Sequence, residues 1–484
     1  MSVALLTPLV LTLGMLLVIV TDLWKSSPAR TYRLSLLCLA LAVLCSFANM
    51  TQAPGQIWSF LTDVLVFDTM SAVLSAIAVF LAFLCVGISW GSFEEEQASS
   101  AEYYSLLMAS TIGAVLVVHV KELLTFFIAF ELLSIPLYML VGFRRYHRKS
   151  AEAGLKYFLS GALSTAIFLF GASWIYGGSG STNYDAIVSG MGQHPQPVLL
   201  GLLMVMAAFA FKLSAAPFHM WAPDTYEGAP IPVAAFLSSV PKVVMLGAAI
   251  RLFGSVSSVL ENETMILLST LSVLSILLGN MVALTQKEVT RLAAYSGVAQ
   301  IGYLLIGLST LMGALGHANF ELANQSLGAM LFYLVIYTVT NVAFWLILLM
   351  VGKTRGATDL DAFNGLAKTS PPLALALLVA LFSLAGVPPL AGFVGKLYLF
   401  RAALYVQPLM AIFGVVGSIL SLVYYFGILR RCYFLEPAED AGPLEVSKSS
   451  LGLLWIMLSL TLVGGLYPGF AQVCMRVAER MIAL

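Results

Sequence analysis

Apolar runs long enough to cross a lipid bilayer recur from one end of this 484-residue chain to the other. A helix needs about 20 mainly apolar residues to span the hydrocarbon core. Of all residues, 60% are hydrophobic and only 10% are charged, whereas soluble domains carry about 25% charged residues. Helices satisfy their own backbone hydrogen bonds, as hydrocarbon requires. The composition therefore predicts an all-α integral membrane protein that crosses the bilayer many times.

Marking the apolar stretches between polar or Gly/Pro-rich breaks predicts about fourteen transmembrane helices. The predicted spans are 2–22, 34–49, 69–90, 102–119, 122–142, 154–177, 197–221, 231–254, 264–285, 290–311, 325–351, 371–402, 407–429 and 450–470. The count depends on two places, because 122–142 follows its neighbour with almost no loop and 371–402 is long enough to contain a break. The first run is too long for a signal-peptide core, so we expect it to be retained.

The distribution of Lys and Arg among the connecting segments predicts the orientation of the chain. Sixteen of the 24 basic residues lie in odd-numbered connections, and five lie in even-numbered connections or the C-terminal tail. Because positive charge gathers on the cytoplasmic side, we expect both termini on the opposite face. The three remaining basic residues, Lys212, Lys242 and Lys396, lie inside apolar spans.

Proline and glycine interrupt two of the predicted spans. One interruption is Lys212–Pro217 in span seven, and the other is Gly386–Gly392 in span twelve, five spans later. An odd-numbered unit that is duplicated in tandem enters the membrane in reversed orientation, so we expect two inverted five-helix units, spans 4–8 and 9–13. A simple proline kink is the alternative for either segment alone. The predicted parts are an N-terminal three-helix segment (1–100), the first unit (101–255), the second unit (262–432) and a C-terminal loop with the last helix (433–484).

Four charged residues at mid-membrane depth are the main candidate functional residues: Glu131, Lys212, Lys242 and Lys396. A charge at this depth costs about 3 kcal/mol on insertion scales, so it has to pair, exchange a proton or face water. Desolvation favours a neutral amine and a nearby carboxylate favours the charged one, so movement of Glu131 would switch the proton affinity of Lys212. The set predicts a hydrated proton path. A structural ion pair is the alternative for Glu131.

Weaker candidates surround these four. His219 follows the first interruption and titrates near neutral pH, although a structural role fits it equally well. Asp224 and Glu227 are expected in the following loop. They either collect protons at the cytoplasmic end of the predicted proton path or are simply solvated acids. Hydroxyl and amide side chains along the spans are expected to hold water or to join helices; they are Ser134, Ser160, Ser164, Ser238, Ser239, Tyr295, Gln300, Tyr303 and Asn341.

Several classes of function are not supported by the sequence. The formal net charge is zero, so there is no basic field for nucleic acid. The chain contains no Gly-rich nucleotide loop, no haem or iron–sulfur ligand set and no clustered acids for a hydrated cation. We therefore expect no cofactor or metal in this chain, and we expect its five cysteines to be packing residues.

Three stretches carry a specific resemblance to a known family. The run Phe211–Pro230 closely resembles the antiporter-like membrane subunits of respiratory complex I. Within it Tyr226–Pro230, together with Gln286–Ser296 and Ser383–Lys396, looks most like subunit N of that complex. The similarity extends over about residues 60–432. It implies fourteen helices with two inverted five-helix units and one broken helix in each.

The resemblance also implies roles for individual residues. Glu131 is similar to the glutamate of span five in the family, and Lys212, Lys242 and Lys396 are similar to the lysines of spans seven, eight and twelve. In the family these residues form a polar axis that is coupled to quinone reduction elsewhere in the complex. One departure is Gln300, where many relatives carry histidine, so the resemblance does not imply a titrating relay group at that point.

The function that the resemblance implies is proton translocation by a non-redox subunit of an NADH- or ferredoxin:quinone oxidoreductase. Flavin, iron–sulfur clusters and quinone are then expected in partner subunits. The expected partners are further antiporter-like subunits, small helical membrane subunits and membrane lipid, without nucleic acid, and the expected location is the bacterial inner membrane. A subunit of a multisubunit sodium/proton antiporter and a structural spacer between true pumps are the alternatives.

Overall fold

A computed structural model describes residues 5–50, 63–92, 100–191, 195–437, 444 and 446–482. Within these ranges the chain is helical and has isolated β-bridges in place of strands. Thirteen helical segments in the described part are long and apolar enough to span a membrane. A shorter apolar helix, Pro371–Ala385, begins the interrupted twelfth span. The predicted all-α membrane fold with about fourteen spans is confirmed.

The chain divides into two compact units, Met1–Leu213 with Gly228–Glu261, and Ser214–Glu227 with Asn262–Ala483. The helices of the first unit are α1 (Leu6–Trp24), α2 (Pro28–Met50), α4 (Thr69–Ile88), α5 (Ser100–His119), α6 (Leu123–Val141), α7 (Arg148–Ser179), α8 (Tyr184–Gly190), α9 (Gln196–Leu213), α11 (Ile231–Leu237) and α12 (Val240–Val256). The helices of the second are α10 (Trp221–Gly228), α13 (Glu261–Ala283), α14 (Val289–Gly316), α15 (Phe320–Arg355), η2 (Asp361–Phe363), α16 (Leu366–Thr369), α17 (Pro371–Ala385), α18 (Ala391–Ala403), α19 (Pro408–Phe434), α20 (Lys448–Leu466) and α21 (Gly469–Ile482). The predicted four-part division stays a prediction.

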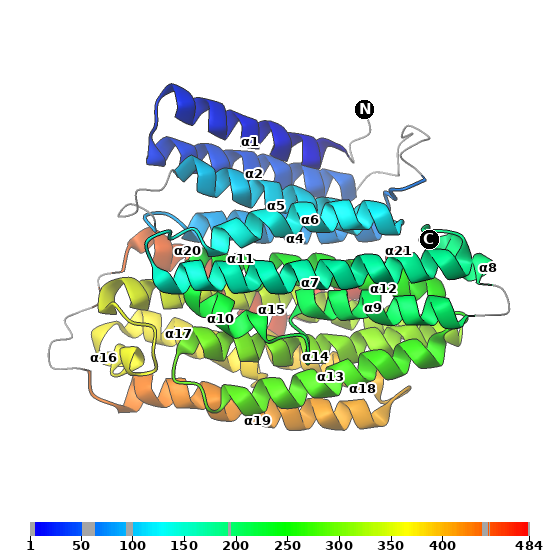
Figure 1. The fold of residues 1–484 in the computed structure, drawn as a ribbon. Helices are drawn as coiled ribbons and strands as arrows, with labels where there is room; N and C mark the ends of the chain where they lie inside the picture. Colours follow the sequence, from blue (N-terminus) through cyan, green and yellow to red (C-terminus); the bar gives the residue numbers. More distant parts are fainter. Residues whose placement is uncertain are drawn as a thin grey trace. The chain divides into compact units, whose positions relative to one another are not determined.

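In the first unit, α7 and α9 lie side by side along most of their length (Figure 1). They approach closely where Gly171 faces Gly201: a Cβ atom added to either glycine would lie 2.7 or 2.5 Å from the carbonyl oxygen of the other. Small residues allow membrane helices to pack backbone to backbone in this way. The opposite face of α7 exposes Leu155, Phe158 and Leu159, as expected of a surface in contact with lipid.

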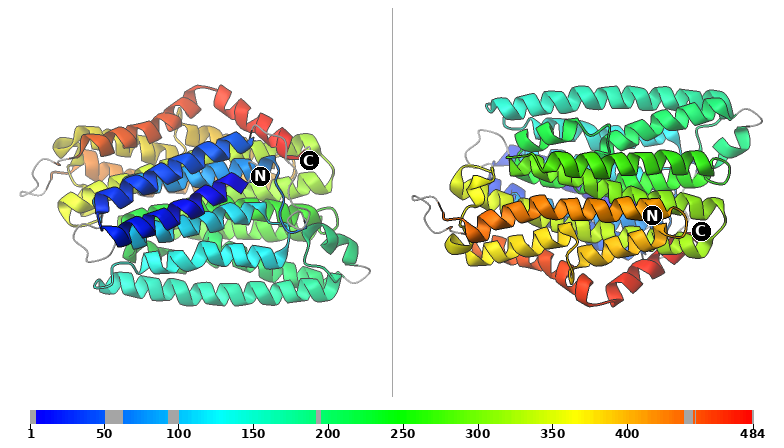
Figure 2. Two further views of the ribbon diagram at one scale, coloured as in Figure 1. Left: turned by 90° about the horizontal axis from the view of Figure 1, so that it is seen from above. Right: turned by 90° about the horizontal axis from the view of Figure 1, so that it is seen from below.

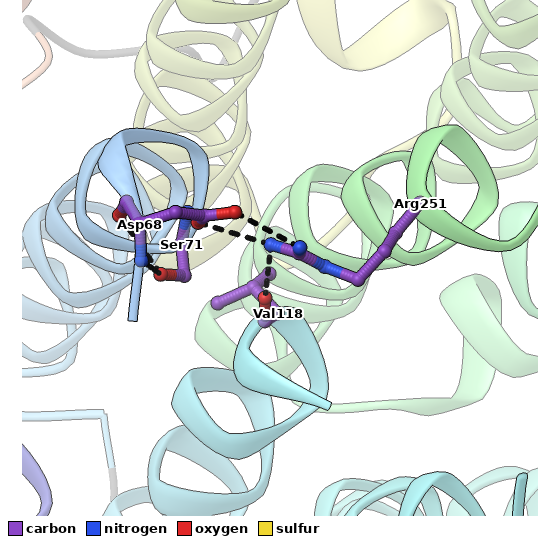
Figure 3. A network of polar contacts seen from close by, with 4 residues as sticks. All are labelled: Asp68, Ser71, Val118 and Arg251. Carbon is purple, nitrogen blue, oxygen red and sulfur yellow. Dashed lines mark hydrogen bonds and ion pairs between the residues drawn. The ribbon is translucent and has the colours of Figure 1, made fainter. Parts of the chain in front are cut away.

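An ion pair joins the ends of three helices in the first unit (Figure 3). Asp68 precedes α4 and caps it, because its carboxylate accepts a hydrogen bond from the backbone N–H of Ser71 at 2.8 Å. Arg251 of α12 donates to both carboxylate oxygens, at 2.9 and 3.0 Å, and to the carbonyl of Val118 in the last turn of α5 at 3.3 Å. Arg251 therefore fastens α12 to the start of α4 and the end of α5.

Several basic residues that were expected in connecting loops lie in helices, and this part of the prediction is wrong. Arg33 is in α2, Arg355 is in α15 and Arg431 is in α19, each just beyond the span predicted for that helix. An apolar pattern stops where charged residues begin. The helices continue past that point because Lys, Arg and Glu are good helix formers.

In the second unit, α15 is a 36-residue helix with 27 of its residues buried. It packs against α14, α17, α18, α20 and α21. The last two helices meet at an angle near Pro468 (Figure 2, left). The amphipathic helix α21 buries Ala471, Cys474 and Ala478, and it lies along α15.

Both predicted helix interruptions are present. In span seven α9 ends at Leu213, and helical structure resumes at Trp221. In span twelve α17 ends at Ala385 and α18 begins at Ala391. Each interruption leaves the last backbone carbonyls of a helix without intrahelical donors inside a membrane-spanning segment.

A third interruption, in span eight, was not predicted. It separates α11 from α12 at Ser238 and Ser239. The hydroxyl of Ser239 donates to the carbonyl of Ala235 at 2.6 Å, and Pro241 has no N–H to continue the ladder. A serine pair followed by proline was the available signal for this break.

Candidate functional site

Lys212 lies in the last turn of α9, directly before the first interruption. Its side chain is only 2% exposed. The ammonium Nζ donates to the hydroxyl of Ser134 at 2.8 Å and to that of Tyr157 at 3.0 Å. The partial negative charge at the carbonyl end of α9 also stabilises a cation at this position. Burial opposes the charged form of Lys212, and these neighbours favour it.

Three aromatic rings surround the same ammonium group. The Nζ atom lies 5.3 Å from the ring centre of Phe130, 5.8 Å from that of Tyr138 and 5.4 Å from that of Tyr157. Cation–π contacts contribute about 0.5–2 kcal/mol each where the ammonium faces the ring, whereas Tyr157 meets Lys212 through its hydroxyl. These aromatic residues were not predicted from the sequence. The signal was two tyrosines inside apolar spans, because a buried Tyr hydroxyl needs a hydrogen-bond partner.

Glu131 lies on α6, three residues before Ser134, and its Oε1 accepts a hydrogen bond from Thr165 of α7 at 2.6 Å. Its side chain is half-buried within this chain. The hydrogen bonds described for Lys212 go to hydroxyl groups, and no ion pair between Lys212 and Glu131 occurs in the part of the chain that the structure describes.

Lys242 lies in the first turn of α12, next to the unpredicted interruption, and is 1% exposed. Pro241 directly precedes it and Ser239 lies three residues before it, and both residues contribute to that interruption. Lys242 therefore shares with Lys212 both deep burial and a position beside irregular backbone.

Lys396 in the second unit belongs to α18 and is 3% exposed. Its Nζ donates to the carbonyl oxygens of Leu384 and Ala385, both at 3.0 Å, which are the last carbonyls of α17. The ring centre of Tyr303 lies 4.5 Å from the same Nζ atom. Lys396 thus caps the half-helix that precedes it, with an aromatic face beneath the ammonium.

The turn between α17 and α18 depends on a glycine. Gly386 has a φ of +86°, in the left-handed region that side chains with a Cβ atom adopt only with strain. A Cβ atom here would also lie 3.0 Å from Cδ of Lys396. Both the conformation and the space around it therefore favour glycine, and the lysine side chain passes directly over this position.

Gln300 joins Lys396 to a chain of buried hydroxyl groups. Its Nε2 donates to the carbonyl of Leu384 at 3.0 Å, the same carbonyl that Lys396 binds. Its Oε1 accepts from the hydroxyl of Tyr333, and the hydroxyl of Tyr425 lies 3.5 Å from its Nε2. An amide does not take up a proton at neutral pH, but it fixes the orientation of the groups on either side.

Some of the predicted hydroxyl and amide residues lie beside a buried lysine, and others do not. Ser134, Gln300 and Tyr303 are in contact with a buried lysine or share its partner, as described above. Ser160 instead donates to the carbonyl of Lys156 in its own helix and is half-buried. Sequence alone did not separate these groups.

The predicted acids of the second unit form an ion-paired cluster. Asp224 and Glu227 lie in the short helix α10 and not in a loop, which corrects the prediction. Arg291 of α14 donates to Asp224 at 2.6 Å and to Glu227 at 2.9 Å. His219 is 6% exposed, and its ring centre lies 6.0 Å from that of Tyr295. The acids anchor α10 to α14.

No group of three or more His, Cys, Asp or Glu side chains suited to a metal ion occurs in the part of the chain that the structure describes. The five cysteines are free thiols, and four of them are buried.

Comparison with known proteins places this arrangement in a family. Residues 120–421 match the family model described as NADH:quinone oxidoreductase/Mrp antiporter, transmembrane. Subunit N of the NADH-quinone oxidoreductase of Moorella thermoacetica is 36% identical over 431 residues, covering 88% of this chain and 87% of that protein. This chain belongs to the NADH:quinone oxidoreductase/Mrp antiporter family. The resemblance to subunit N that the motifs indicated is confirmed.

Solved structures of this family share the fold. A chain of respiratory complex I from Thermus thermophilus is 29% identical, with a TM-score of 0.77, and the match covers 96% of this chain and 97% of that one. A chain of the Mrp complex from Dietzia is 22% identical, with a TM-score of 0.84 over 100% and 97% of the two chains. At that identity, the second likeness shows the fold alone. The proton-carrying roles of Glu131 and the three lysines stay predictions within this family.

Proposed function

We propose that the chain is a proton-translocating membrane subunit of an NADH- or ferredoxin:quinone oxidoreductase. The observation that carries this proposal is three lysines that are each at most 3% exposed and each lie beside a helix interruption. An isolated buried lysine is costly, and three in irregular backbone are typical of an ion path. The identity with subunit N and the family membership support the same function.

In the first unit the proposed exchange group is Lys212. A hydroxyl group both accepts and donates hydrogen bonds, so Tyr157 can accept from the ammonium and donate to the neutral amine. Glu131 is the modulating carboxylate, since its charge acts on Lys212 from a position fixed by Thr165. Lys242 is the group that passes the proton inward.

In the second unit the proposed store is Lys396. Its partners, the carbonyls of Leu384 and Ala385, only accept hydrogen bonds, so they stabilise the ammonium and offer nothing to the neutral amine. The face of Tyr303 acts in the same direction. His219 is a weaker proton-accepting candidate in this unit.

The driving reaction takes place in other chains under this proposal. Flavin, iron–sulfur clusters and quinone belong to partner subunits, and this chain contributes neither electrons nor a redox centre. Further antiporter-like subunits and small helical subunits are its membrane partners. The chain lies in the bacterial inner membrane with both termini on the non-cytoplasmic side, in accordance with its Lys and Arg distribution.

The rival function is ion exchange in a multisubunit sodium/proton antiporter, which the fold shared with the Dietzia Mrp chain permits. Purification of the assembled complex in mild detergent, followed by transport measurements in vesicles, separates the two. We expect flavin and iron–sulfur subunits to copurify, and we expect proton movement that requires an electron donor and quinone but no sodium. Copurification of small hydrophobic chains alone, with ion exchange in the absence of a donor, would contradict the proposal.

A further inference from the structure

We infer that the second unit binds an anionic phospholipid in a cavity between α15, α18 and α21, with the phosphate held by Arg401 and Arg476. The cavity has a volume of about 610 Å³, which lies within the range of small-molecule sites. It is lined by two arginines, polar and aromatic side chains, a methionine and two alanines, and these include Gln325, Tyr398, Arg401, Gln472, Met475 and Arg476. The site does not depend on the proposed proton translocation.

The charge of the cavity calls for an anion. Arg401 and Arg476 are exposed, and neither has a hydrogen-bond or ion-pair partner within the described residues. No carboxylate is among the lining residues. The planar guanidinium group binds phosphate oxygens through two parallel hydrogen bonds, so two of them around one cavity suit a phosphate group.

The amide and hydroxyl groups of the cavity suit the rest of a lipid headgroup. Gln472 of α21 and Tyr398 of α18 are among the residues that line the cavity, and their side chains carry an amide and a hydroxyl group. Gln325 lies in the second turn of α15 and also donates to Glu321 at 3.4 Å. These side chains offer hydrogen bonds to the glycerol and ester oxygens that adjoin a phosphate.

The surroundings favour a lipid over a free anion or an acidic protein segment. Arg401 is in the last turn of a span, and α21 is an amphipathic helix that directly follows the last span and packs along α15. Leu397 directly precedes the lining residue Tyr398 and is 50% exposed, and Tyr405 follows Arg401 by four residues and is 68% exposed. Together with Met475, these apolar side chains provide a path for acyl chains that leave a bound headgroup.

Native mass spectrometry of the full chain in mild detergent tests this site. Phosphatidylglycerol and phosphatidylcholine are added separately to the wild type, to Arg401→Gln/Arg476→Gln and to Arg480→Gln. Arg480 lies on the same helix but does not line the cavity, so it is the matched control. We expect the wild type and the control to bind one phosphatidylglycerol about tenfold more tightly than phosphatidylcholine, and we expect the double variant to lose that preference.

Four outcomes would overturn the inference. The first is an unchanged preference in the double variant. The second is full displacement of phosphatidylglycerol by millimolar inorganic phosphate, which would show a site for a small anion. The third is unchanged lipid binding combined with loss of assembly with other membrane subunits, which would assign the arginines to a protein contact. The fourth is an equal loss of the preference in Arg401→Lys/Arg476→Lys and in Arg480→Gln, while the elution volume and helix content of the lysine variant stay unchanged. That result would show that the preference does not depend on the arginines that line the cavity.

Discussion

Lys212 and Lys396 keep buried ammonium groups by different means. Lys212 binds two hydroxyl groups within a ring of aromatic side chains, whereas Lys396 binds two backbone carbonyls. A hydroxyl group accepts a hydrogen bond from the charged lysine and donates one to the neutral lysine, whereas a carbonyl oxygen only accepts and so stabilises the charged form. The contacts therefore suit Lys212 to exchange a proton and Lys396 to store one.

Removal of one hydroxyl group tests this distinction. In Tyr157→Phe, Lys212 loses one of its two described hydrogen-bond acceptors. A hydrogen bond to a charged group contributes about 1.5–3 kcal/mol, so we expect proton translocation by the complex in vesicles to slow by about tenfold or more. The control is Tyr176→Phe on the same helix, whose side chain is 57% exposed. Equal rates in both variants would remove Tyr157 from the proton path.

Among the elements, the interrupted helices give the lysines their surroundings. The carbonyl end of α17 is available to Lys396 only because that helix stops at Ala385 and the chain turns at Gly386. The short segment before α18 then brings Lys396 back over the turn. The position of the lysine is therefore a property of the turn as much as of the residue.

Substitution of the turn glycine should displace Lys396. Gly386→Ala places a Cβ atom 3.0 Å from Cδ of Lys396 in a left-handed conformation that costs about 1–2 kcal/mol. We expect a lower melting temperature and reduced proton movement per electron. Gly427→Ala is the control, because a Cβ atom there meets nothing within 4 Å, and we expect it to behave as the wild type. Similar losses in both variants would show that the turn has no special role.

The ion pair at the ends of α4, α5 and α12 predicts a pH dependence of stability. Burial alone would raise the pKa of Asp68, but the charge of Arg251 and the hydrogen bonds from Arg251 and Ser71 have the larger combined effect, so the pKa lies below its ordinary value. A carboxyl group with a lowered folded-state pKa stabilises the protein above its unfolded pKa of about 3.9, and this contribution is lost as the pH falls through the folded value.

Asp68→Asn should therefore destabilise the first unit by about 2 kcal/mol at pH 7. The difference in melting temperature between this variant and the wild type should shrink as the pH is lowered below about 4. Asp185→Asn serves as the control, since Asp185 is exposed. A difference between Asp68→Asn and the wild type that stays constant with pH would mean that the carboxylate charge does not contribute.

For the whole molecule, the sequence predicted the features that depend on one segment at a time. Apolar length gave the spans, and Pro with Gly gave the interruptions beside Lys212 and Lys396. Features that depend on which helices meet were missed, such as the contact of Tyr157 with Lys212 and the pairing of Arg291 with Asp224. Spacing along one chain does not show which face of a neighbouring helix a side chain meets.

The number of protons moved per electron by the assembled complex in vesicles tests the central claim most directly. It is measured with Lys212→Met, with Lys396→Met and with Lys156→Met as a control, because Lys156 is exposed and pairs with Glu152 at 2.8 Å. We predict that either buried-lysine variant lowers the ratio and that the control keeps it. A full ratio in both buried-lysine variants, with electron transfer intact, would contradict proton translocation through these lysines.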